Sequence, residues 1–153
     1  MNVWSAIVAS LHYLAIMGMA ATLALEVMTL KGAVTQAAIT RLARVDMFYG
    51  ISALLVLATG LARVFWFGKG ADFYLHNVLF HIKLTIFLAV ALWSILPTVR
   101  FIRWNAAAKA SGSLPTAAQF NSMRKVVFSE LHLLALLPIL AAFMARGFGF
   151  SGG

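Results

Sequence analysis

The sequence predicts an all-α integral membrane protein, a bundle of four membrane-spanning helices. Of its 153 residues, 63% are hydrophobic and only 10% are charged, whereas a soluble domain carries about 25% charged residues. The excess lies in four apolar runs, each near or above the ~20 residues that a helix needs to cross the hydrocarbon core. These runs are too long and too continuously apolar for the alternating strands of a membrane barrel. They cover Val3 to Leu30, Met47 to Phe67, Val78 to Leu96 and Val126 to Ala145.

The first two helices follow from the first two runs. The run from Val3 to Leu30 has no basic segment before it and exceeds the ~7–15 apolar residues of a signal peptide, so we expect it to remain as a helix. A basic connector is predicted from Lys31 to Arg44. Asp46 is predicted to open the second helix, where a carboxylate suits the positive end of the helix dipole.

The last two helices are joined by a longer segment. The third helix is expected to continue beyond Pro97 as a basic extension to Trp104, and the small and polar stretch 106–116 is expected to be a flexible loop. We assign residues 1–146 to a single four-helix transmembrane domain and residues 147–153 to a flexible tail.

The net charge of +8 is explained by topology rather than by nucleic-acid binding. Basic residues gather in the first and third connections, which is the positive-inside pattern. It predicts both termini on the outer, periplasmic side of a bacterial cytoplasmic (inner) membrane, with the basic loops against anionic lipids of the cytoplasmic leaflet. These residues are Lys31, Arg41 and Arg44, and then Arg100, Arg103, Lys109, Arg124 and Lys125.

The chain contains no cysteine. This excludes disulfides, iron–sulfur clusters, thiolate metal sites and covalently attached c-type haem. Histidine, lysine, methionine and carboxylates are the remaining candidate ligands.

Polar residues in the first two helices recur at helical spacing. In the first helix, Ser5, His12, Met19 and Glu26 are seven residues apart and lie almost on one face. The second helix has a similar seam, and we expect both seams to face the interior of the bundle. Its residues are Asp46, Tyr49, Ala53, Val56, Gly60 and Arg63.

Three of the four acidic residues lie towards the predicted inner boundary, with many basic residues near them in the sequence. We expect Glu26, Asp46 and Glu130 to pair with these bases and to anchor the helix ends. His132 follows Glu130 by two residues and should point to a different face.

His12 is the most informative residue, because an ionisable side chain at membrane depth is costly and usually faces a partner in the bundle. It lies roughly 13 Å along its helix from the outer end. An interhelical hydrogen bond is one explanation; an axial haem ligand, a metal ligand or a proton carrier are the others. The predicted outer half also contains Arg63, His76, His81, Lys83 and Arg146.

A b-type haem fits this set of residues. His12 supplies an axial nitrogen, and Lys83 or a histidine supplies a second one, while Lys83 can alternatively extend to the interface. Arg63 and Arg146 are placed to receive the propionates. Copper is the alternative cofactor, with His12 and a methionine, Met17 or Met19, among its ligands.

Over its full length, the chain resembles an uncharacterised bacterial family of small predicted membrane proteins with four spans. That family has no established activity to transfer to this chain. The resemblance is carried by stretches in each part of the sequence. These are Leu11 to Ala15, Arg41 to Gly50, Ala58 to Val64, Gly70 to Leu75 and Leu137 to Gly147.

A more distant resemblance concerns two short motifs. Leu11-His12 and the segment from Leu79 to Leu84 are similar to the membrane-embedded, haem-binding protoporphyrinogen IX oxidase of bacteria. That resemblance implies His12 and Lys83 as the essential pair. The oxidase has a proline and an arginine after its first-helix histidine, which are missing here, so the similarity favours a haem site over oxidase chemistry. The histidine motif also resembles the copper-resistance membrane protein D family.

The sequence therefore predicts a small membrane protein that binds b-type haem or a porphyrin in its outer half, for electron transfer or tetrapyrrole oxidation. It leaves open whether the protein is an enzyme. One alternative is a non-catalytic accessory or assembly subunit of a larger membrane complex. Another is a copper or small-solute transport protein, which would need a homo-oligomer because four helices are few for alternating access.

Overall fold

The computed structural model describes residues 3–149, and all its regular secondary structure in this range is helical. Four helical segments are long and apolar enough to cross a membrane, as the sequence predicts. The third crosses as two helices in series, α4 and α5. The elements are α1 (Val3–Lys31), α2 (Gln36–Ala62), the π-helical turn η1 (Arg63–Phe67), α3 (Ala71–Leu75), α4 (Val78–Trp93), α5 (Ile95–Ser111) and α6 (Ala117–Ala145).

Threonine caps begin two of the long helices. The hydroxyl of Thr35 accepts a hydrogen bond from the backbone N–H of Ala38 at 3.1 Å, so α2 begins at Gln36. The prediction that Asp46 opens this helix is therefore wrong, and the connector after α1 is only residues 32–35. Because the cap lies ten residues earlier than expected, Asp46 is carried into the interior of the bundle.

The loop before α6 is also shorter than predicted. α5 continues through the alanine-rich segment to Ser111 and ends at Gly112, whose positive φ of 69° suits glycine. A capping box formed by Thr116 and Gln119 then starts α6. The predicted loop 106–116 is wrong in its first half, because alanine favours helix strongly.

The third span bends where proline requires it. Pro97 has no N–H to donate to the carbonyl of Trp93, four residues earlier, and its ring crowds that carbonyl. α4 ends at Trp93, and α5 begins at Ile95 after the single turn residue Ser94. The predicted extension beyond Pro97 is confirmed and reaches seven residues farther, to Ser111 rather than Trp104.

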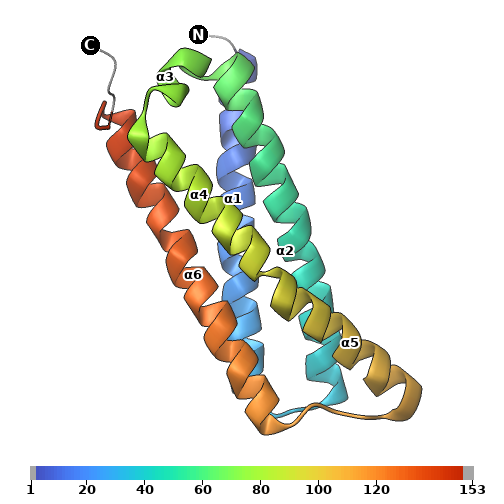
Figure 1. Cartoon of the computed structure of the whole chain (residues 1–153). Coiled ribbons are helices and arrows are strands. Elements are labelled where there is room, and N and C mark those ends of the chain that lie inside the picture. Colours follow the sequence, from blue (N-terminus) through green and yellow to red (C-terminus); the bar gives the residue numbers. More distant parts are fainter. Residues whose placement is uncertain (1–2, 150–153) are drawn as a thin grey trace.

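The third span crosses the bundle diagonally. α4 packs against α6, whereas α5 packs against α2, and α1 lies behind them in contact with both α2 and α6. α2 and α4 consequently diverge towards the end of the bundle at which α1 begins and α6 ends (Figure 1). We call this the terminal end, and we call the opposite end, which holds loops 32–35 and 112–116, the connector end.

The predicted polar seams face the interior. Met19 and Glu26 of α1 are each 1% exposed, and Asp46, Tyr49 and Val56 of α2 are also buried. Many large apolar side chains elsewhere on the long helices are exposed, which is the arrangement expected of a surface that contacts lipid. The bundle therefore combines a narrow, partly polar core with an apolar exterior.

The segment after α6 folds back onto the start of α4. The fully buried side chain of Asn77 caps α4 by accepting from the backbone N–H of Leu79, and donates to the carbonyl of Phe148 at 3.1 Å. The backbone N–H of Val78 donates to the carbonyl of Gly149 at 2.8 Å. Residues 147–149 of the predicted tail therefore contact the start of α4, and the remainder of the tail, 150–153, lies outside the described residues.

Candidate functional site

Three basic side chains from three helical segments approach one another in the terminal half of the bundle. His12 of α1 interacts electrostatically with Arg63, the first residue of η1, and with Lys83 of α4, and Lys83 in turn interacts with Arg63. All three are partly buried. None forms an ion pair within residues 3–149, where the only ion pair joins His76 and Asp72. We call His12, Arg63 and Lys83 the basic cluster.

The hydrogen bonds of Thr59 determine which nitrogen of His12 carries the proton. The Thr59 hydroxyl donates its single proton to the carbonyl of Leu55, one helical turn earlier. It lies 2.9 Å from Nδ1 of His12 and must accept there, so Nδ1 is the protonated nitrogen. Nε2 of the neutral imidazole then carries the lone pair, as in a histidine prepared to bind a metal.

Gly60 allows the His12 ring to lie directly against α2. A Cβ at this position would lie 3.3 Å from Cε1 of His12, which is tighter than an ordinary contact. The same two helices also meet closely at Gly18, where a Cβ would lie 2.9 Å from the hydroxyl of Ser52. Small residues along this interface therefore fix the position of the imidazole.

The π-helical turn positions Arg63. Its guanidinium carbon lies 5.4 Å from the centroid of the Tyr13 ring, a distance at which a cation and an aromatic face attract each other. Ser5 donates to the carbonyl of Phe67 at 2.6 Å, which fastens the end of the turn to the start of α1. A π-helical turn at such a place is common at functional sites.

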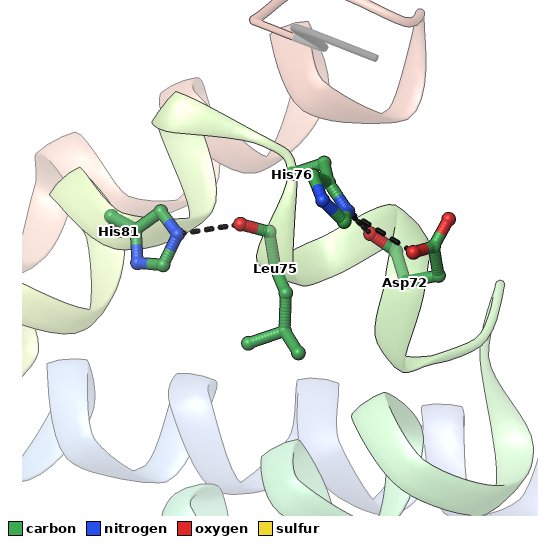
Figure 2. Close-up of polar contacts among 4 residues, drawn as sticks. All are labelled: Asp72, Leu75, His76 and His81. Atoms are coloured by element: carbon green, nitrogen blue, oxygen red, sulfur yellow. Dashed lines mark hydrogen bonds and ion pairs between the residues drawn. The ribbon is translucent and has the colours of Figure 1, made fainter.

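His76, just before α4, and His81, in its first turn, have hydrogen-bond partners within residues 72–75 (Figure 2). Nδ1 of His76 lies 2.9 Å from the carbonyl of Asp72 and 3.1 Å from its carboxylate. Nε2 of His81 donates to the carbonyl of Leu75 at 2.8 Å. Their spacing of seven residues predicts that His76 and Lys83 share a helix face. This prediction is wrong, because α4 begins only at Val78.

The other predicted ligands are dispersed. Arg146 is exposed at the end of α6. Met17 is 66% exposed and Met19 is 1% exposed, so they lie on different faces of α1. Within residues 3–149, no three histidine, aspartate or glutamate side chains are grouped so that they could hold a metal ion. This disfavours a metal centre built from such side chains alone, whereas a haem iron needs only one or two protein ligands.

The acidic residues of the core form a second group, nearer the connector end. Glu26 of α1, Asp46 of α2 and Glu130 of α6 are 1%, 6% and 0% exposed and interact electrostatically with one another. The expectation that they pair with basic residues is wrong, since no such ion pair exists within residues 3–149. Their burial explains this difference, because the basic residues at the connector end are exposed or only partly buried. We call the three residues the carboxyl cluster.

His132 lies outside both clusters. It is exposed on α6, and its Nδ1 donates to the carbonyl of Phe128 at 2.7 Å. The sequence correctly places it on a different face from Glu130.

Sequence reasoning missed Thr59, Ser94 and Thr98. It also missed the role of Gly60, which lies beside His12. A signal for Thr59 exists, because it lies four residues before Arg63 and so shares a helix face with it. Thr98, whose hydroxyl donates to Asp46 at 2.9 Å, follows a proline in the third span, and nothing in the sequence pairs it with the second span.

The family model described as "Predicted membrane protein (DUF2214)" matches residues 4–149. The chain belongs to this family. The membership agrees with four membrane-length helices and with the full-length resemblance given above. No curated protein and no solved structure gives a significant match. The distant similarities to the oxidase and to the copper-resistance protein therefore rest on the residues quoted for them alone.

Proposed function

We propose that this membrane protein binds b-type haem or a related porphyrin at the basic cluster, for electron transfer or tetrapyrrole oxidation. The observation that carries the proposal is the hydrogen bond between His12 and Thr59, which leaves a lone pair on Nε2 at membrane depth. This bond is also the interhelical hydrogen bond expected of a structural histidine. The two cations that interact with His12, Arg63 and Lys83, are what favour a haem ligand with acidic groups.

The charges of the cluster support an acidic ligand. Two permanent or potential cations, Arg63 and Lys83, lie close together in the membrane without an anionic partner in the described part of the chain. Such an arrangement is unfavourable by itself and becomes favourable when an anion lies between the cations. The propionates of a haem would supply this anion, with Arg63 as their principal donor, because guanidinium binds carboxylate in a bidentate manner.

The surroundings support an apolar ligand. The neighbours of the basic cluster in the sequence include exposed apolar side chains. Leu11, Leu61 and Ile82 are 52%, 44% and 41% exposed. A flat macrocycle reaching the cluster from the lipid would cover such side chains. Bound iron would supply one-electron chemistry; His12 would hold it and Thr59 would keep the imidazole in place.

The proposed orientation puts the connector end in the cytoplasm of a bacterial inner membrane. Most of the exposed lysine and arginine residues lie at that end, and the positive-inside pattern and anionic lipids support this placement. The basic cluster would then lie in the periplasmic half.

An absorption spectrum of the protein purified in mild detergent, before and after addition of haem, tests the cofactor. We expect a Soret band that is lost in His12→Ala and kept in His132→Ala, a matched control on an exposed histidine. Thr59→Val should weaken haem retention, and Thr59→Ser should restore it. Lack of a Soret band in the supplemented wild-type protein would refute the proposal and would favour an accessory role within a larger complex.

Lys83 can bind either a haem propionate or the iron, and the variant Lys83→Arg distinguishes these two roles. Arginine keeps the positive charge but cannot serve as a neutral nitrogen ligand. If Lys83 binds a propionate, Lys83→Arg keeps the wild-type spectrum. If Lys83 binds the iron, the spectrum of Lys83→Arg changes while haem is still retained through His12.

A further inference from the structure

The carboxyl cluster presents a charge that the protein itself does not neutralise. Three of the four acidic residues of the chain are buried together, one each from α1, α2 and α6. No lysine, arginine or histidine among residues 3–149 forms an ion pair with any of them. Carboxylates cannot stay charged and buried without a counter-charge, so another species must provide one.

The oxygens of the cluster also lack hydrogen-bond partners. Both oxygens of Glu130 and one oxygen of Glu26 are buried without one, and so is the hydroxyl of Tyr49. Tyr49 is 3% exposed and interacts electrostatically with all three carboxyls, which places its hydroxyl beside the cluster. The Ser94 hydroxyl lies near that of Tyr49, so the stronger indication of a ligand is Glu130, which is 0% exposed and has two oxygens without a partner. Buried polar atoms without a hydrogen-bond partner are otherwise rare.

The groups that face the cluster from the third span are neutral. Ser94, near Tyr49, donates its own proton to the carbonyl of Ala91, and Thr98 donates to Asp46. The titratable groups that surround the site are therefore Glu26 on α1, Asp46 and Tyr49 on α2, and Glu130 on α6. None of these groups supplies a positive charge.

A surface groove reaches one member of the cluster, Asp46. It has a volume of about 420 Å³ and lies between α2 and α5, with Asp46, Thr98 and Asn105 as its polar lining. Asn105 lies towards the connector end, where it accepts a hydrogen bond from Thr40. Asp46 belongs both to the groove and to the carboxyl cluster, so it links the surface with the fully buried Glu26 and Glu130.

We propose that the carboxyl cluster is a proton-binding site inside the membrane, loaded from the connector end through this groove. Protons and a few water molecules would neutralise the carboxyls and satisfy their free oxygens and the Tyr49 hydroxyl. A metal cation fits less well, because the same carboxyls are not grouped closely enough to hold one. This inference does not depend on haem binding, since the two clusters share no residue.

Two carbodiimides of different polarity test the proposal on the intact protein in lipid nanodiscs. Dicyclohexylcarbodiimide is apolar and reacts with protonated carboxyls within membranes, whereas a water-soluble carbodiimide reaches exposed carboxyls. We expect the apolar reagent to label Glu26 or Glu130, as mapped by mass spectrometry, and the labelling to decrease as the pH is raised. Asp72, which is exposed, should react only with the water-soluble reagent and serves as the internal control.

Added sodium or potassium distinguishes protons from metal cations. Labelling that is unchanged when choline chloride is replaced by sodium or potassium chloride supports proton binding. Protection by either metal ion, or no labelling of the cluster at any pH, would overturn the proposal. The wild-type measurement is sufficient even if a variant fails to fold. In variants that fold, Glu130→Gln should reduce the number of protons that the buried site releases when the pH is raised. Asp72→Asn is the control and should leave the number of protons released by the buried site unchanged.

Discussion

The basic cluster and the carboxyl cluster both contain residues of α1, fourteen positions apart, yet they differ in how they meet the surroundings. His12, Arg63 and Lys83 are only partly buried, next to apolar side chains that face lipid. Glu26 and Glu130 are completely buried, and Asp46 reaches the surface only along a groove. The proposed ligands differ accordingly: a large amphiphile for the first cluster, and protons with small molecules such as water for the second.

The difference arises from the crossing of the third span. α4 lies on α6 and leaves α2 at the terminal end, while α5 covers α2 at the connector end (Figure 1). The helix break near Pro97 separates these two packing arrangements. The break therefore lies between the part of the third span that packs on α6, where Lys83 belongs to the basic cluster, and the part that packs on α2, where Thr98 contacts the carboxyl cluster.

The largest effect is expected when one positive charge of the basic cluster is replaced by a negative charge. Lys83→Glu gives Arg63 an internal ion-pair partner, which competes with any anionic ligand. We expect the affinity for haem to decrease about tenfold or more, corresponding to roughly 1.4 kcal/mol, as measured by spectrophotometric titration. Glu130→Gln is the control from the carboxyl cluster and should leave the affinity unchanged. An equal affinity of the wild type and Lys83→Glu for haem would mean that the basic cluster does not bind the haem propionates.

The sequence was sufficient for the membrane class, the four spans and the inward seams, because these depend on apolar length and helical periodicity. It failed for the start of α2, since the Thr35 cap is a local signal that the more apolar run beginning at Met47 obscured. It also failed for the carboxyl cluster. The net charge suggested abundant partners for Glu26 and Glu130, and only the packing shows that these bases stay outside.

The site was predicted in part for the same reason. His12, Arg63 and Lys83 follow from depth and from the seams, which are properties of single helices. The separation of His76 and His81 from them depends on where α4 begins, and this is set by the Asn77 cap and the returning segment 147–149. Contacts between distant parts of the chain are not visible in one sequence.

A second effect concerns stability and compares the two clusters without a ligand. Glu130→Met replaces a buried carboxyl that has no partner by an apolar side chain of similar size. We expect the free energy of unfolding in detergent to increase by about 1–2 kcal/mol, as measured by denaturant titration. Lys83→Met should produce a smaller gain, because Lys83 is only partly buried. Destabilisation by Glu130→Met would indicate that the water molecules proposed at the carboxyl cluster contribute more to stability than the burial of this carboxyl costs.

A third effect tests how closely α2 must approach His12. Gly60→Ala places a methyl group 3.3 Å from Cε1 of His12, so the ring must move by a few tenths of an ångström. We expect a two- to fivefold loss of haem affinity, which corresponds to less than about 1 kcal/mol. Gly50→Ala is the matched control on the same helix, because its Cβ would meet nothing within 4 Å. Equal behaviour of the two variants would show that the ring position is not critical.

The smallest effect is expected at the histidines that the structure separates from the basic cluster. His76→Ala removes an exposed ion pair with Asp72, and His81→Ala removes a hydrogen bond to the carbonyl of Leu75, each contributing about 1 kcal/mol or less. Both variants should therefore keep the wild-type haem spectrum and nearly the wild-type stability, measured by absorption and thermal unfolding. Loss of the Soret band in either variant, comparable to that in His12→Ala, would instead place a second iron ligand before or at the start of α4. The distinction between an iron ligand on α1 and structural histidines near α3 depends on this result.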